Sequence, residues 1–272
     1  MFDRWRSAWS QRREASALRR RAIPEPLWQL TLLRYPFLSR RSPQDMAELR
    51  RLCSLFLASK EFHGVAGFEV TDEVAVAVAA QACLPVLHLG LDWYSGFVGI
   101  VMHADEVVAQ REYLDEDGVV HQYEEELAGE AMEGGPLMLS WSALSPEADP
   151  AAASADSVYC LVIHEFAHVI DMRDGCADGV PALASMAARL HWLGVLEPEW
   201  QRFCERVDAG EPTLIDPYGA ESLEEFFAVA VEAFFVAPAE MRAEQAALYR
   251  LLADFFRQET ANGQLYSLIE PT

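Results

Sequence analysis

The feature that most constrains this chain is a strongly apolar stretch at residues 156–175, which contains an H-E-x-x-H motif. In its central part the only strongly polar residues are those of the motif, His164, Glu165 and His168. A helix that is apolar on nearly all sides lies in a protein core. Burying two histidines and a carboxylate there is unfavourable unless a partner satisfies their polar atoms. The stretch therefore predicts a buried helix whose polar residues share a partner.

The spacing of the two histidines fits a metal site. Positions i and i+4 share one face of a helix, so His164 and His168 project side by side. Two imidazoles placed in this way can share one Zn²⁺, and Glu165 on the neighbouring flank can reach a water on that metal. A core helix with hydrogen-bonded histidines is the alternative interpretation. Because the context is so apolar, we expect zinc as the cofactor.

Composition and cysteine usage indicate the compartment. The 272-residue chain is 51% hydrophobic, enough for a sizeable core, and has no run of about 18 apolar residues that could span a membrane. The N-terminal residues lack the apolar run and cleavage site of a signal peptide. Five cysteines are scattered without a disulfide framework or a metal-binding spacing. These features predict a reduced, soluble, cytoplasmic protein without stable membrane insertion.

Charge is distributed unevenly along the chain, and the net charge is −22. Residues 1–51 contain 12 arginines and five acidic residues, whereas residues 52–272 contain nine lysines and arginines and 38 acidic residues. The acidic body is a poor candidate for binding nucleic acid. We expect the arginine-rich residues 1–22 to form an N-terminal arm on a single domain of residues 23–272. A basic amphipathic helix that contacts a membrane or a partner is the alternative for the arm.

Hydrophobic periodicity predicts strands first and helices afterwards, which is the order of an α+β fold and not of alternating βαβ units. We expect Ser42 and Thr71 to cap two early helices. For the motif helix we expect Asp156 or Ser157 as the cap and Gly175 as the end. The expected segments are helices near 42–59 and 71–83, a turn at 62–69, strands within 97–108 and at 136–141, hairpin and loop at 113–134, and mainly helix between the loop at 174–181 and about residue 260.

A zinc site with two histidines needs a third protein ligand and an open position for water. A second highly apolar helix, predicted within residues 216–236, offers Glu224, Glu225 and Glu232. Glu225 has another interpretation, because Ser222 followed three residues later by a glutamate fits a capping box. The spacing alone leaves all three glutamates open as the third ligand.

Several stretches of the chain resemble one protein family, in the same order. The sequence is similar to the Mlc titration factor A family of bacterial zinc metallopeptidases and, more distantly, to the catalytic domain of anthrax lethal factor. The similarity covers roughly residues 50–240. The matching stretches are KEFHGVAGFEVTDE, AAQACLPVLHLGLDWYSGF, GGPLMLSW, HEFAHVID and DPYGAESLEEFFAVAVEAFF.

The resemblance implies a zincin-like α+β fold, with a small sheet packed on the motif helix and a largely helical C-terminal half. It implies a gluzincin arrangement, in which His164, His168 and a glutamate from a later helix bind zinc. In this family a tyrosine precedes the ligand glutamate by seven residues, and Tyr218 and Glu225 match that spacing. Asp171 matches the aspartate that closes the family's HExxHxxD pattern. We expect it to orient a ligand or a neighbouring backbone group, with a helix-end hydrogen bond as the alternative.

The predicted activity is hydrolysis of peptide bonds in peptide or protein substrates, with an aminopeptidase among the expected forms. Glu165 is expected to act as general base and Tyr218 to stabilise the oxyanion. The strand at 136–141 is expected to form the edge of the cleft. The resemblance implies His121 as a candidate fourth metal ligand in a resting form, with a solvated loop histidine as the alternative. It also implies an alternative function, sequestration of a transcriptional repressor protein with peptidase activity secondary.

Overall fold

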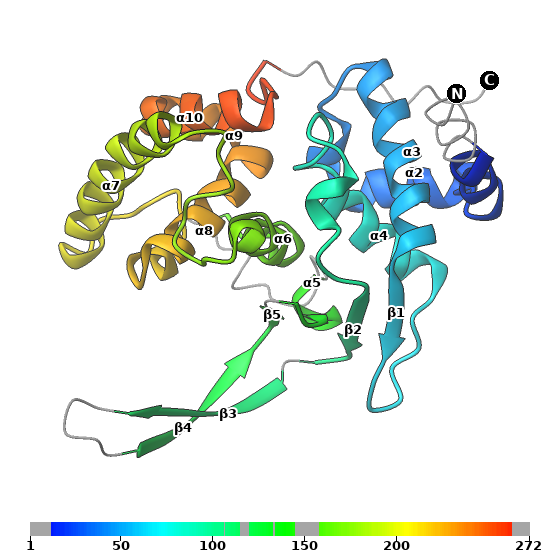
Figure 1. Cartoon of the computed structure of the whole chain (residues 1–272), viewed down its shortest axis with the longest axis horizontal. Helices are drawn as coiled ribbons and strands as arrows, with labels where there is room; N and C mark the ends of the chain where they lie inside the picture. The colour runs from blue at the N-terminus through cyan, green and yellow to red at the C-terminus, as the bar shows by residue number, and fades with distance from the viewer. Residues whose placement is uncertain (1–11, 106, 115–119, 133, 145–157, 263–272) are drawn as a thin grey trace.

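The computed structural model describes residues 12–105, 107–114, 120–132, 134–144 and 158–262, and for residues 107–114 and 120–127 it describes the backbone alone. Its helices and two small sheets form an α+β fold, as the sequence predicts. Figure 1 shows the helix that carries the motif in the middle of the molecule, between the early helices and the C-terminal helices. Sheet and helices from both halves of the chain therefore surround the motif.

The strands form one sheet of four strands and one of two. They are β1 (Glu61–Gly64), β2 (Gly99–His103), β3 (Val107–Leu114), β4 (Val120–Leu127), β5 (Gly129–Ala131) and β6 (Leu137–Ser140). The larger sheet has the order β1-β2-β6-β5, in which the first three strands are parallel and β5 pairs antiparallel with β6 at one edge. β3 and β4 form an antiparallel hairpin that projects from the body (Figure 1).

The helices carry the predicted caps in the early part of the chain. They are α2 (Glu25–Arg34), α3 (Pro43–Ser59), α4 (Asp72–Cys83), α5 (Trp141–Leu144), α6 (Leu161–Asp171), α7 (Met186–Asp208), α8 (Leu223–Val236), α9 (Pro238–Glu244) and α10 (Ala246–Phe256). Ser42 accepts a hydrogen bond from the Asp45 N–H at the start of α3, and Thr71 accepts one from the Val74 N–H in α4. Both predicted caps are therefore confirmed. Within the described part of the chain, no helix combines the length and the apolar character needed to cross a membrane.

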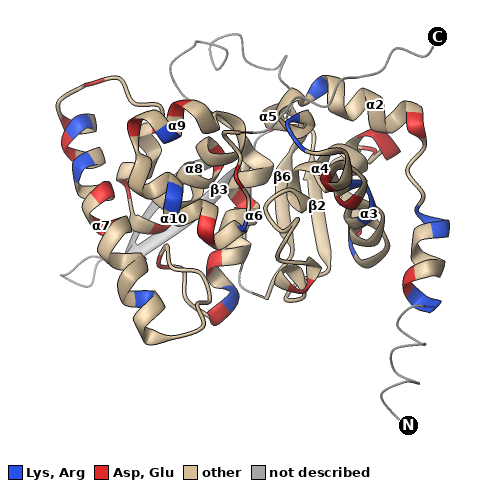
Figure 2. Cartoon of the chain, turned by 90° about the horizontal axis from the view of Figure 1, so that it is seen from above, with Lys and Arg blue, Asp and Glu red and all other residues tan. Residues whose placement is uncertain are grey.

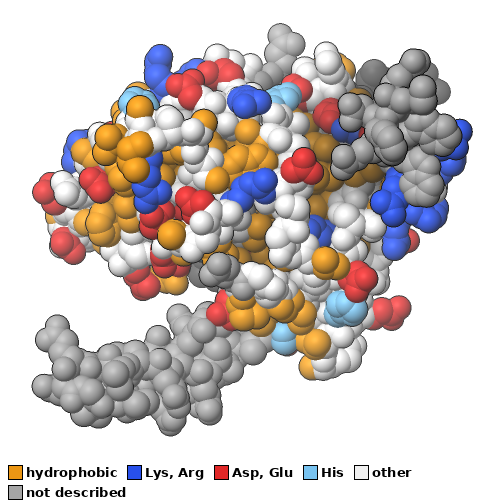
Figure 3. Space-filling view, viewed as in Figure 1, with side chains coloured by type: hydrophobic (Ala, Val, Ile, Leu, Met, Phe, Trp, Pro, Cys, Tyr) orange, Lys and Arg blue, Asp and Glu red, His pale blue; other side chains and the backbone are white. Residues whose placement is uncertain are grey.

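Residues 12–20 are helical. Glu14 forms an ion pair with Arg51 of α3, which ties this segment to the body. Figure 3 shows basic side chains gathered on this side of the molecule, and Figure 2 shows acidic side chains spread over many elements. The five cysteines are free, as the scattered spacing predicts.

An aromatic cluster fixes the orientation of α6 in the core. The ring of Phe166 lies 4.8 Å from that of Tyr94, 5.7 Å from that of Phe56 and 5.9 Å from that of Phe97, measured between centroids. These rings come from α3, from the 3₁₀ turn Leu91–Tyr94 and from the segment after it. Because Phe166 is fully buried among them, the opposite face of α6 turns toward α8 and β5.

The start of α6 differs from the prediction. The helix begins at Leu161 after Cys160, while Val158 and Tyr159 are not helical; the expected caps at 156 and 157 lie outside the described residues. At the other side α6 ends at Asp171 and continues as a 3₁₀ turn, Met172–Asp174. Gly175 ends this turn with φ 91°, the left-handed conformation that favours glycine.

Two predictions about the sheet were wrong. The segment at 62–69 is not only a turn, because β1 occupies its beginning and pairs in parallel with β2. The strand expected at 136–141 forms β6, but it does not form the cleft edge, since β2 and β5 flank it on both sides. The edge is β5, a strand of three residues within the segment predicted to be hairpin and loop.

Candidate metal centre

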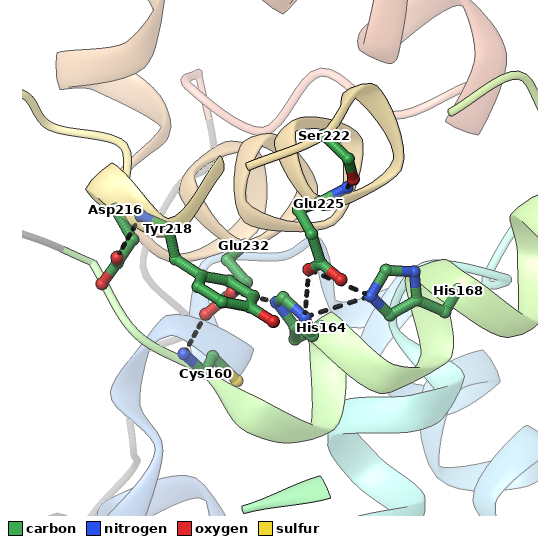
Figure 4. Close-up of polar contacts among 8 residues, drawn as sticks. All are labelled: Cys160, His164, His168, Asp216, Tyr218, Ser222, Glu225 and Glu232. Carbon is green, nitrogen blue, oxygen red and sulfur yellow. Dashed lines mark hydrogen bonds and ion pairs between the residues drawn. The ribbon is translucent and has the colours of Figure 1, made fainter. Parts of the chain in front are cut away.

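Three atoms with metal-binding capacity converge between α6 and α8. The Nε2 atoms of His164 and His168 lie 3.1 Å apart, and the Glu225 Oε2 atom lies 3.2 Å from the first and 3.4 Å from the second. Figure 4 shows Glu225 pointing from α8 toward the two imidazoles on α6. This group of two histidines and one glutamate could hold a metal ion.

A buried carboxylate fixes the orientation of His164. The Nδ1 atom of His164 lies 2.9 Å from Oε1 of Glu232, which is fully buried. An ionised carboxylate only accepts, so Nδ1 carries the proton and donates it, which directs Nε2 toward the cluster. The other oxygen of Glu232 accepts a hydrogen bond from the Cys160 N–H at the start of α6. Glu232 therefore connects the imidazole and the helix start.

The electrostatics of the cluster favour a cation. Burial lowers the pKa of His164, but the carboxylates of Glu225 and Glu232 outweigh burial and raise it to about 10. Burial raises the pKa of Glu225, but the imidazoles of His164 and His168 outweigh it and lower the pKa to about 2. Glu225 is therefore ionised, and the carboxylates around His164 stabilise positive charge at this place. A metal ion can supply that charge instead of a proton.

The donor set fits zinc. Ligand atoms at about 2.0–2.2 Å from a tetrahedral zinc ion lie about 3.3–3.6 Å apart, close to the separations in the cluster. Oε2 of Glu225 is buried, and no hydrogen-bond donor among the described residues is aligned with it, although both imidazole nitrogens are near. An unsatisfied buried carboxylate oxygen facing two imidazole nitrogens is the arrangement that a metal ion would complete.

Glu165 lies deep in the site, next to β5. Its side chain is 4% exposed, and burial raises its pKa, while the two imidazoles act in the opposite direction. A Cβ atom at Gly129 would lie 2.5 Å from Oε1 of Glu165, so a larger residue at this position of the edge strand would displace the Glu165 side chain. Gly129 was not among the residues predicted for the site. A glycine inside a short strand, where a second group approaches the backbone, is the signal that could have indicated it.

Tyr218 borders the site from the segment before α8. It belongs to a 3₁₀ turn, Pro217–Ala220, whose start is held by a hydrogen bond from the Tyr218 N–H to Oδ1 of Asp216 (2.9 Å). Its ring centroid lies 6.2 Å from that of His164, and the side chain is 43% exposed. Tyr218 lines a cavity of about 280 Å³ together with the three converging residues, Glu165, Glu224 and the strand β5.

Asp171 lies outside the cluster and contacts a backbone group. Its Oδ2 atom accepts a hydrogen bond from the Gly179 N–H (2.8 Å), and burial raises its pKa to about 7. Gly179 has φ 75°, and a Cβ atom there would lie 2.6 Å from the Leu223 carbonyl oxygen. Asp171 therefore holds the loop after α6 against the start of α8. Ala177 of this loop lines the cavity of the metal centre.

The other residues that the sequence offered as metal ligands lie outside the converging group or outside the described side chains. Glu224 lines the cavity but is not one of the converging residues. Glu232, which the spacing left open as a ligand, instead supports His164; it lies two helical turns after Glu225, on the same face of α8. His121 lies on β4, opposite Tyr113, and not in a loop as expected. Its side chain is outside the described residues.

Comparisons with known proteins agree on one family. Residues 7–257 match the model of the family described as glucose-regulated metallo-peptidase M90, which extends beyond the stretch identified from the sequence. An uncharacterized protein of Synechocystis sp. is 35% identical over 251 residues, covering 91% of this chain and 89% of the relative. Proteins named Mlc titration factor A are 32% identical, that of Cronobacter sakazakii over 85% of this chain and 86% of its own length, and that of Salmonella gallinarum over 84% of each. With the metal-binding geometry between α6 and α8, these matches show that the chain belongs to the M90 family of glucose-regulated metallopeptidases.

Proposed function

We propose that this protein is a cytoplasmic zinc peptidase of the zincin-like, gluzincin type, in which His164, His168 and Glu225 bind the metal. The observation that carries the proposal is the convergence of two imidazole nitrogens and one carboxylate oxygen beside a second buried carboxylate, Glu165. Membership in a metallopeptidase family supports it. The arrangement leaves room for water and substrate, because the cavity of about 280 Å³ opens onto the cluster.

The proposed chemistry assigns proton transfer to Glu165. A zinc ion held by the three ligands would act as a Lewis acid, which lowers the pKa of a water in its open position to about 7 and polarises a carbonyl group. Glu165 accepts a proton from the attacking water and delivers it to the leaving amine. Burial favours this role because it raises the pKa of Glu165. A carboxylate with a raised pKa is a stronger base, and its pKa lies closer to that of the water from which it accepts the proton.

Tyr218 is proposed to stabilise the developing oxyanion. Its hydroxyl is the only phenol lining this cavity among the described residues, and its backbone is held by Asp216. A hydroxyl in a partly desolvated site can donate a hydrogen bond to charge that develops in the transition state. Tyr218 lies on the α8 side of the cavity, whereas Glu165 lies on the β5 side. The two residues therefore approach a bound substrate from opposite sides.

The edge strand β5 is proposed to hold the peptide. Ser140 of β6 donates a hydrogen bond to the Ala128 carbonyl (2.7 Å), and paired residues alternate along an antiparallel ladder. Gly129 and Ala131 therefore direct their N–H and C=O groups away from β6, toward the open edge. An extended substrate can add to such an edge as a further strand. In the proposed arrangement, the scissile bond lies near Gly129, beside Glu165.

Glu165→Gln tests the proposal, because glutamine keeps the size of the side chain but removes its basicity. Zinc content and the free energy of unfolding should stay near the wild-type values, while peptide hydrolysis should fall by about 10²–10⁴-fold. Glu224→Gln is the matched control, since Glu224 lines the same cavity but is not one of the three converging residues. Undiminished hydrolysis by Glu165→Gln would contradict the mechanism.

Capture of a protein partner is a second candidate function. The relatives' name, Mlc titration factor A, describes titration of Mlc, and the family resemblance implies a transcriptional repressor as the captured partner. In that case partner binding survives both Glu165→Gln and Tyr218→Phe. A zinc-loaded wild type that cleaves no peptide in a broad library, yet binds the repressor tightly, would favour this function over peptidase activity.

A further inference from the structure

A second cavity of about 520 Å³ adjoins the metal centre. Ala131 at the end of β5 and Met172 after α6 line both cavities, so the two adjoin at the end of the edge strand. The second cavity extends past the end of β5 toward the β5–β6 turn and away from Glu165. A peptide lying on the edge strand would therefore pass its mouth.

Apolar side chains from three separate segments form the walls of this cavity. Phe97 and Leu137 are buried, whereas Met132 is 46% exposed at the rim. The apolar lining residues are Trp93, Phe97, Ala131, Met132, Leu137, Val169 and Met172. Apolar walls of this kind favour an apolar occupant, because burying its surface removes that surface from water.

The cavity also has a polar part, which consists of Arg173, Ser95 and the backbone of three glycines. The Arg173 guanidinium lies 4.9 Å from the ring centroid of Trp93 and donates a hydrogen bond to the Asp92 carbonyl. Trp93 also makes an edge-to-face contact with Phe255 of α10, with 5.5 Å between ring centroids. Trp93 is thus held from two sides. Arg173, occupied with the ring and the carbonyl, acts as part of the wall and not as an isolated positive charge.

The register of β5 decides which side of a substrate meets the cavity. Glu165 lies against Gly129, while the cavity begins at Ala131, two residues later along the strand. A peptide that adds antiparallel to β5 runs from Ala131 toward Gly129. Its residues near Ala131 and beyond precede the bond that lies beside Glu165.

We propose that this cavity is a substrate subsite that receives a bulky apolar side chain, such as Phe, Leu or Met, on the amino-terminal side of the scissile bond. The inference rests on the proposed function, since it takes the position of the scissile bond from Glu165 and the edge strand. The proposal adds a preference for one class of substrate side chain, which does not follow from the metal ligands alone.

A peptide library tests the preference. The peptides are amidated heptamers, each made with a free and with an acetylated N-terminus, in which each position in turn carries Phe, Leu, Met, Ala, Asp or Lys, and mass spectrometry locates the cleaved bond. Bulky apolar residues at one position before that bond should raise kcat/KM by about 10–100-fold over Ala. A preference for Asp, a preference confined to positions after the bond, or equal rates for all side chains would overturn the assignment.

Met132→Trp tests whether this cavity causes the preference. The larger side chain at the rim should fill the cavity and lower the ratio of kcat/KM for Phe over Ala by about 10-fold, whereas Met132→Ala should keep a preference for the larger side chains. Met186→Trp is the matched control, because Met186 is also exposed but lies at the start of α7, outside the cavity lining. An unchanged Phe/Ala ratio in Met132→Trp would overturn the proposal.

Binding without turnover separates failure of the subsite from failure of the peptidase proposal. Calorimetry on Glu165→Gln should give a lower Kd for the Phe peptide than for its Ala analogue, and adding Met132→Trp should remove the difference. If the wild type cleaves nothing but this difference is found, the peptidase proposal fails and the apolar side-chain site stands. If Glu165-dependent cleavage is found with no such difference in Kd or kcat/KM, the subsite fails and the peptidase proposal stands.

Discussion

The helices α6 and α8 are both apolar and buried, but they begin in different ways. At the start of α8 the Ser222 hydroxyl accepts a hydrogen bond from the Glu225 N–H, so this helix carries its own cap. At the start of α6, Cys160 supplies no side-chain cap. Its N–H donates instead to Glu232, which belongs to α8. The helix with the H-E-x-x-H motif therefore depends on α8 for its cap, whereas α8 has no such dependence.

This difference makes the metal centre a unit of two helices. Glu225 and Glu232 lie two turns apart on the face of α8 that contacts α6. The first faces the proposed zinc position, and the second holds His164 and the start of α6. The side of α8 that turns toward α6 is thus acidic, and α6 supplies the imidazoles. Changes that separate the two helices should therefore affect metal binding and stability together.

The largest effect is expected from zinc itself, because its ligands come from both helices. Removing zinc with a chelator should lower the free energy of unfolding by about 4 kcal/mol, if free zinc was about 1,000 times Kd, and lower Tm accordingly. His168→Ala and Glu225→Gln should abolish this difference, whereas Glu224→Gln should retain it. The measurements are elemental analysis and calorimetric Tm with and without chelator. Equal behaviour of the two glutamate variants would remove Glu225 as the third ligand.

The next effect concerns the cap that α6 receives from α8. Glu232→Gln keeps the size of the side chain but replaces one carboxylate oxygen by an NH₂ group, which cannot accept a hydrogen bond. The amide therefore cannot accept from both the Cys160 N–H and the His164 Nδ1–H. We expect a loss of about 2–4 kcal/mol in the free energy of unfolding and about 10–100-fold weaker zinc binding. Denaturant unfolding and zinc titration measure the two. Glu240→Gln on the exposed face of α9 is the control, and a loss no larger than in that variant would show that α6 does not need the contact.

The same contrast explains which helix start the sequence could predict. Ser222 and Glu225 are three residues apart, so the cap of α8 is visible in a local pattern. The acceptor for Cys160 lies 72 residues later in the chain, and no local pattern indicates it. The prediction therefore found the apolar character of α6 and the face of its motif, but placed its start too early. The role of Glu232 was missed for the same reason.

The sheet shows a similar limit. Strand β6 was identified from its short run of apolar residues, but its place inside the sheet depends on pairing with β2 and β5. Gly129–Ala131 is too short to show an alternating pattern, and β1 contains a glycine and two polar residues. Long-range pairing, not local propensity, makes these segments strands. The edge of the cleft could therefore not be predicted, although the residues of the candidate metal centre could.

A smaller effect is expected at the other end of α6, where Asp171 is buried near a helix C-terminus. Burial raises its pKa to about 7, above the ordinary value of about 3.9. Between these values the folded protein retains a proton that the unfolded chain has released, so rising pH favours unfolding. The free energy of unfolding of the wild type, relative to Asp171→Asn, should fall by about 1–3 kcal/mol between pH 4 and pH 7, after allowance for screening. Denaturant unfolding of both proteins with chelator present gives this difference, and parallel pH curves would contradict it.

The smallest effect is expected from the cap that α8 supplies for itself. Ser222→Ala removes the acceptor for the Glu225 N–H and should cost about 1 kcal/mol of the free energy of unfolding. Zinc affinity should change little, because the Glu225 carboxylate faces the imidazoles and not the cap. Ser185→Ala is the matched control, since Ser185 caps α7 in the same way, away from the metal centre. Similar losses in unfolding and unchanged zinc titrations for both variants would show that α8 positions Glu225 by packing. A zinc affinity that falls only in Ser222→Ala would show that the cap positions the ligand, and that α8 resembles α6 in needing a specific start.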